Sequence, residues 1–165
     1  MKTAQQLITE LKALFPLAPL PEKIVNYEGG GFEPPLVKAF FQGRIWTDVT
    51  LETLRQYASD SGACLNFMSH EAFRYFLPAF LFMMLDDYDR VSGMTIYSST
   101  LFQLNPDDGV FTREWHEERF SFTPAQKQLI AEILYHEHIL HDEQMNYLAE
   151  EPLNSYWKDF LTLPL

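Results

Sequence analysis

The sequence has a single cysteine, Cys64, and no long hydrophobic run. One cysteine cannot close an intramolecular disulfide, and the opening residues MKTAQQLITELK lack the continuous apolar core of a secretory signal. The longest apolar run, LPAFLFMML at 77–85, is far shorter than the roughly 20 residues that a membrane-spanning helix needs. We therefore expect a cytoplasmic protein that does not enter a membrane.

Basic residues are also scarce, with 12 lysines and arginines against 23 acids and a formal net charge of -11. Nucleic-acid binding depends on cationic side chains that displace counterions, so we expect no nucleic-acid partner. The acid is uneven: residues 1–102 hold 11 acids and 8 bases, whereas residues 103–165 hold 12 acids and 4 bases. A field of this sign attracts basic proteins, although many proteins are acidic merely for solubility.

What the chain has in quantity is hydrophobic and aromatic side chains, at 47% and 15% of 165 residues. This length suits one domain with one core, which we predict over 1–165. Residues 70–85 are apolar nearly all round, and Pro78 lies inside them, so we predict a central buried helix pair kinked or divided at that proline. An irregular arm rich in proline and glycine is expected at about 16–35. The predicted fold class is all-α, a single compact helical domain.

Local signals predict where several helices begin. Thr3, Thr50, Ser69 and Thr123 each stand at an N-cap position before a hydrophobic pattern. The last helix should run from about 124 to about 148, with a short amphipathic piece at 153–161 after Pro152. Residues 94–104 fit either a strand or a helix; no other segment offers a strand to pair with, so we predict a helix. Residues 107–122 read as a polar loop with aromatic residues.

Catalytic motifs are weak. Cys64 has no histidine nearby in sequence and is more typical of a buried hydrophobic position than of a nucleophile. The triple glycine at 29–31 lacks the lysine and serine of a phosphate-binding loop, and the two serines at 98–99 have no glycine-flanked elbow. We therefore expect no catalysis and no cofactor.

The segment YHEHILHDE at 135–143 holds three of the five histidines. The zinc motif H-E-x-x-H fails because Leu140 stands where the second histidine is required. Helical geometry places Glu137 and His141 together on the inward face as an i, i+4 pair. It places His138 and Asp142 on the outward face, flanked by His136. The alternative to a binding function is a metal-dependent enzyme or metal-binding protein that uses this cluster, namely His136, Glu137, His138, His141 and Asp142, with ligands from elsewhere such as His70 or His116.

Three segments together, FFQGRIW at 40–46, FMSHEAFRYFLPAFLFMML at 67–85 and RFSFTPAQKQLIAEIL at 119–134, resemble a family of small bacterial proteins of unknown function. Its hallmark is a core of the form E-A-F-R-Y-x-L-P-A-F. The resemblance covers Phe40 to Leu134, and the chain departs from it at Phe122 and after Tyr135. It implies no activity and no site residues. Within the hallmark, Arg74 is expected to pair with an acid such as Glu71.

The function that we predict is therefore a non-catalytic acidic binding protein for a basic partner. Its most specific form is an immunity or inhibitor protein that neutralises a basic toxin such as a nuclease. Aromatic residues interleaved with the acids would anchor the interface. The residues predicted to bind the partner are Asp107, Asp108, Glu114, Trp115, Glu117, Glu118, Asp142 and Glu143.

Overall fold

The computed structural model describes residues 1–26, 31–92, 94–141 and 143–162, and for residues 143–146 it describes the backbone alone. Within these residues the chain is all-α, as predicted, and pairing of β type is limited to one isolated bridge between Val25 and Met68. The α-helices are α1 (Ala4–Leu14), α2 (Glu33–Phe41), α3 (Leu51–Leu54), α4 (Cys64–Phe67), α5 (His70–Asp86), α6 (Tyr88–Val91), α7 (Thr95–Gln103), α8 (Arg113–Arg119), α9 (Pro124–Leu140) and α10 (Glu143–Ser155). Short 3-10 turns are η1 (Trp46–Asp48), η2 (Ser61–Ala63) and η3 (Trp157–Phe160).

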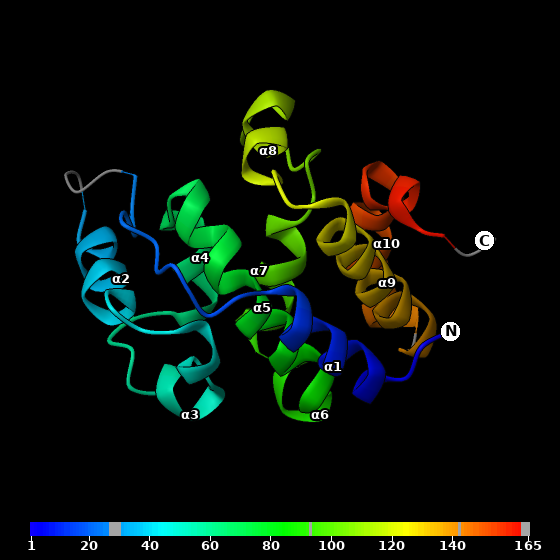
Figure 1. Cartoon of the computed structure of the whole chain (residues 1–165), viewed down its shortest axis with the longest axis horizontal. Coiled ribbons are helices and arrows are strands. Elements are labelled where there is room, and N and C mark those ends of the chain that lie inside the picture. Colours follow the sequence, from blue (N-terminus) through cyan, green and yellow to red (C-terminus); the bar gives the residue numbers. More distant parts are fainter. Residues whose placement is uncertain (27–30, 93, 142, 163–165) are drawn as a thin grey trace.

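The helices are arranged around α5 (Figure 1). Helix α1 packs against both α5 and α9, and α9 pairs with α10 on one side of the molecule. Helices α2, α3 and α4 lie on the other side, while α8 projects from the top of the view. None of the helices within the described residues is both long enough and apolar enough to cross a membrane.

Helix α5 is the centre of the core, as its sequence predicted. Eleven of its 17 residues are buried, and the rings of Phe73, Phe76 and Phe80 are fully enclosed. Burial of each such side chain stabilises the fold by about 1.5–3 kcal/mol. The helix begins at the predicted cap, where Ser69 Oγ accepts from the backbone N–H of Ala72 at 3.0 Å. Pro78 lies inside this helix and does not divide it.

The other predicted helix starts are confirmed. Thr3, Thr50 and Thr123 each form a capping box with the residue three positions later. Residues 95–103 form α7, so the helix predicted for this segment is confirmed. Helix α3 is only one turn long, and it buries Leu51 and Leu54, with Tyr57 buried just after it.

Several predicted boundaries are wrong. The long helix ends at Leu140 rather than near 148, because the backbone at His141 is extended and α10 packs back against α9. Pro152 lies inside α10 and does not begin a new piece. Helix α2 begins at Glu33, within the expected arm, because prolines in a first turn cost no helical hydrogen bond. Residues 113–119 are helical rather than loop.

Candidate functional site: an acidic and aromatic surface on α8

Helix α8 is a short helix with a strong local start and a buried end. Thr112 caps it by accepting from the backbone N–H of Trp115 at 3.3 Å. The last residue, Arg119, is fully buried. Because a seven-residue helix has little stability of its own, this burial at its C-terminal end is what holds α8 against the body of the protein.

The guanidinium of Arg119 is the anchor. It donates to the backbone carbonyls of Leu65 and Met68, the latter at 3.1 Å, and to Gln103 Oε1 at 3.0 Å. It also lies 3.8 Å from the ring centroid of Phe73. No carboxylate forms an ion pair with it among the described residues. Burial, followed by the nearby charge of Arg74, lowers the pKa of Arg119 to about 9, so the group is still charged at neutral pH.

Asp108 and His116 form a second buried contact beneath α8. Asp108 Oδ2 lies 3.3 Å from His116 Nε2, and the two side chains are 0% and 1% exposed. The other carboxylate oxygen accepts from the backbone N–H groups of Val110 and Phe111, at 2.8 and 3.2 Å. Asp108 was predicted to face a partner; instead its carboxylate closes the turn before α8 and points inward.

Four of the other predicted acids face solvent around α8. The side chains of Asp107, Glu117 and Glu118 are 58%, 56% and 76% exposed, and Glu114 is exposed as well. Arg113 lies 3.3 Å from Asp107 and 3.7 Å from Glu117, so it compensates only part of this charge.

His70 does not neutralise Glu118, although its Nδ1 lies 3.6 Å from the carboxylate. Burial lowers the pKa of His70, and this effect outweighs the opposite effect of Glu118. The imidazole is therefore neutral at pH 7. Arg74, which was expected to pair with Glu71, instead donates to the backbone carbonyl of Glu118 at 2.9 Å.

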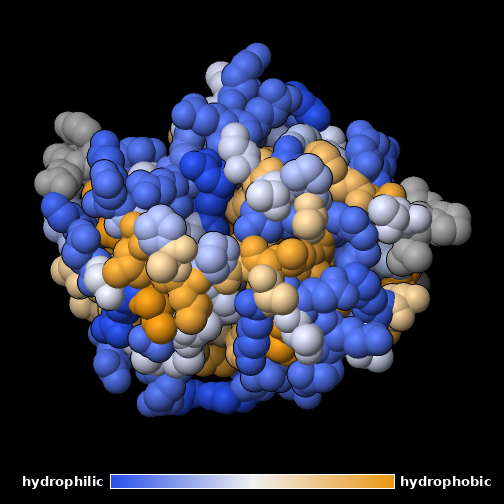
Figure 2. Space-filling model, viewed as in Figure 1, coloured by the Kyte–Doolittle hydropathy of each residue, from blue (hydrophilic) through white to orange (hydrophobic). Residues whose placement is uncertain are grey.

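An aromatic pair lies among these acids. Phe111 stacks on Trp115 with ring centroids 4.0 Å apart and an interplanar angle of 12°. Trp115 also makes an edge-to-face contact with the ring of His70. The guanidinium carbon of Arg119 lies 4.8 Å from the ring centroid of Trp115. Phe111 is 42% exposed and Val110 is 64% exposed, so part of this apolar group is open to solvent. The region around α8 is otherwise mainly hydrophilic (Figure 2).

We call this set of residues the α8 surface. It consists of Asp107, Val110, Phe111, Glu114, Trp115, Glu117 and Glu118. Val110 was missed by sequence reasoning, because nothing local marks an exposed valine as part of a surface. Asp142 and the side chain of Glu143, which were also predicted to bind a partner, lie outside the described residues.

The histidine segment forms a separate buried cluster at the end of α9. Glu137 is 1% exposed, and its Oε2 lies 3.1 Å from His141 Nε2, so the predicted inward pair is present. Tyr97 O–H donates to the same oxygen at 3.2 Å. His136, which was expected to flank the outward set, is instead buried, with Nδ1 3.4 Å from Glu137 Oε1. The ring of Tyr88 stacks on the ring of His141, with the two ring centroids 3.3 Å apart.

This cluster has the contacts of a buried polar network. The carboxylate of Glu137 is enclosed by the three groups around it, and burial raises the pKa of Tyr97 with a further contribution from the Glu137 charge. Among the described residues no group of three or more histidines, cysteines or acids is arranged to hold a metal ion.

No curated protein and no solved structure matches the chain. The model of a family of unknown function, DUF6714, matches residues 36–161 and so includes α8, the histidine segment and most of the acidic C-terminal part. Because this match spans most of the sequence, the chain belongs to the DUF6714 family of unknown function.

Proposed function

We propose that this protein is a non-catalytic cytoplasmic binding protein that uses the α8 surface to bind a basic protein. The observation that carries the proposal is the placement of four exposed acids around the stacked pair of Phe111 and Trp115. Aromatic side chains in such a position supply much of the binding energy at protein interfaces. Surrounding carboxylates steer a basic partner and speed its association.

The buried anchor supports the same function. Arg119 and the contact between His116 and Asp108 hold α8 in place before a partner arrives. A surface that is already ordered loses less conformational entropy on binding. In its most specific form, the partner is a basic toxin such as a nuclease, and this protein is the immunity or inhibitor protein that covers its cationic active site.

Three substitutions that remove a negative charge while keeping the size of the side chain test the α8 surface. We expect wild-type protein to capture a basic protein from lysate, and the combined variant Glu114→Gln, Glu117→Gln and Glu118→Gln to lose it. A matched control removes the same three charges elsewhere, with Asp48→Asn, Asp89→Asn and Glu151→Gln, all at exposed positions. With the purified partner, the α8 variant should associate at least about tenfold more slowly at low salt, and the difference should shrink as salt rises.

Equal binding by the α8 variant and its control would contradict the proposal. The inhibitor form has its own test: one equivalent of this protein should abolish the partner's toxic or nuclease activity. A partner that binds through α8 and keeps full activity would leave the binding function in place and exclude inhibition. Elemental analysis tests the metal-dependent alternative, which stoichiometric zinc or iron would favour.

A further inference from the structure

A groove lies between the start of α3 and the C-terminal half of α5, at the opposite end of the molecule from α8 (Figure 1). It consists of two neighbouring cavities of about 240 and 250 Å³ that share Thr50 and Phe82 as lining residues. Both volumes are below the roughly 300–1,000 Å³ of typical small-molecule sites. Cavities of this size suit single side chains presented by another protein.

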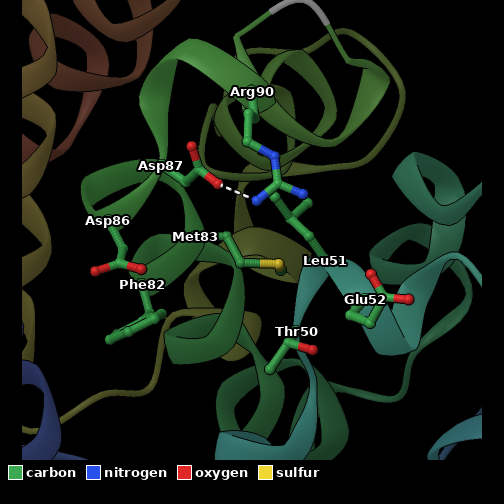
Figure 3. A pocket seen from close by; sticks show the side chains of 8 residues that line it. All are labelled: Thr50, Leu51, Glu52, Phe82, Met83, Asp86, Asp87 and Arg90. Atoms are coloured by element: carbon green, nitrogen blue, oxygen red, sulfur yellow. Dashed lines mark hydrogen bonds and ion pairs between the residues drawn. The ribbon is translucent and has the colours of Figure 1, made fainter.

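The floor of the groove is apolar. Trp46, Val49 and Ala79 line one cavity, and Leu51 and Met83 line the other. In the view of Figure 3 the side chain of Met83 lies between Phe82 and Leu51, and the Arg90 guanidinium lies beside Leu51. These five side chains are themselves buried, whereas Phe82, which lines both cavities, is partly exposed. A partner's apolar side chain that covers Phe82 removes apolar surface from water and so stabilises the complex.

Acidic side chains stand along the rim of the cavity next to α6. Glu52, Asp86 and Asp87 line it, against one base, Arg90. Asp87 is already paired, since its Oδ2 accepts from Arg90 Nη1 at 2.6 Å (Figure 3).

Asp86 retains an uncompensated charge. Glu52 pairs with Arg55 at 2.9 Å, whereas Asp86 is exposed and forms no ion pair within the part of the chain that the structure describes. The cavity therefore has a free carboxylate beside an apolar floor. At the far end of the groove Lys12 is the charged residue among the described lining residues, and its Nζ lies 4.9 Å from the ring centroid of Phe82.

We propose that this groove binds a segment of another protein through two side chains. An apolar side chain enters the cavity formed by Trp46, Val49 and Ala79, and a lysine or arginine enters the other and pairs with Asp86. Spacing of i and i+2 in an extended segment, or i and i+3 or i+4 in a helix, presents two side chains on one face. The proposal does not depend on the α8 surface, because different helices form the two sites.

Peptide selection tests the proposal without knowledge of the partner. Random twelve-residue peptides displayed on phage are selected on immobilised wild-type protein, and peptides that bind the bare support are removed. The variant Thr47→Phe is kept for the binding measurements that follow. Thr47 is exposed and lines the apolar cavity, so phenylalanine there should fill the cavity while leaving the core intact. We expect the enriched peptides to share an apolar and a basic residue at one of the spacings above.

Binding of the synthetic peptides is then measured by fluorescence anisotropy. Thr47→Phe should weaken binding more than about tenfold, the effect typical of a blocked anchor pocket. Asp86→Asn should weaken it by about two- to fivefold, as expected for an exposed ion pair. The matched controls Asn66→Phe and Asp89→Asn are exposed and line neither cavity, so they should change binding less than about twofold.

Three results would overturn the inference. The first is selection that yields no apolar and basic pair. The second is peptide binding that survives both groove variants but is lost in the α8 charge variant, which would assign these peptides to α8 and leave the proposed function standing. The third is a dimer by light scattering that Thr47→Phe converts to a monomer, because the groove would then hold a second copy of this chain.

Discussion

Tyr97→Phe removes one hydrogen bond from a buried carboxylate and leaves the aromatic ring in place. The Tyr97 side chain is fully buried, and its O–H donates to Glu137 Oε2 at 3.2 Å. Hydrogen bonds to charged groups contribute about 1.5–3 kcal/mol. Since 3.2 Å is longer than the roughly 2.5–3.0 Å usual for O–H donors, we expect the loss to lie in the lower half of this range, with the free energy of unfolding lowered by about 2 kcal/mol.

Urea unfolding at pH 7, followed by circular dichroism, measures this loss directly. For a chain of this size about 1 kcal/mol corresponds to about 2–4 °C in Tm, so a decrease of about 4–8 °C should accompany it. Tyr147→Phe is the matched control, because Tyr147 is 51% exposed. The control should change stability by less than about 0.5 kcal/mol.

Equal stability of the two variants would refute the reasoning, because Glu137 would then not depend on Tyr97. A double-mutant cycle with Glu137→Gln isolates the pair. A coupling energy near zero, despite a loss in the single variant Tyr97→Phe, would assign the effect to packing of the phenol and not to the hydrogen bond.

Three further predictions concern the stability and reactivity of the core. Burial raises the pKa of Cys64 to about 12 and leaves the thiol fully enclosed, so a disulfide reagent at pH 8 should label it only at the rate of unfolding. The pKa values of Cys64, Tyr57 and Tyr97 are all raised, chiefly by burial, from ordinary values of 9.0, 10.0 and 10.0. Above these ordinary pKa values the three groups lose their protons in the unfolded chain but keep them in the folded chain. The stability that the three groups contribute is therefore complete below pH 9 and decreases as pH rises, more steeply above pH 10. Urea midpoints measured between pH 8 and 11 check this, and Tyr97→Phe should flatten the decline. Gly62→Ala should lower the free energy of unfolding by about 1–3 kcal/mol, because the new Cβ would lie 2.5 Å from Thr95 Oγ1 and 2.8 Å from its backbone carbon; unchanged thermal stability would contradict this.

The sequence alone predicted the all-α class and the starts of α1, α3, α5 and α9. A capping threonine or serine and the residue three positions later determine a helix start within a single turn, so Thr3, Ser69 and Thr123 could be assigned without tertiary information. The absence of any polar face on residues 70–85 likewise predicted that α5 is central.

Part of the candidate site was also predictable. The acidic excess after residue 102 and the aromatic residues among the acids pointed to the region of α8, and Glu114, Glu117 and Glu118 are exposed there. Composition cannot distinguish these acids from Asp108, whose carboxylate points inward. That orientation depends on His116 and on the turn before α8.

The remaining features are decided by contacts between residues far apart in the chain. Tyr97 is 40 positions from Glu137, and Arg119 is 54 positions from Leu65, so no local pattern encodes either contact. The end of α9 at Leu140 follows from the return of α10 against α9, and the groove exists only where the start of α3 meets α5. Hydrophobic periodicity and capping act within a few residues, whereas burial of a polar group and the shape of a cavity depend on every helix packed around them.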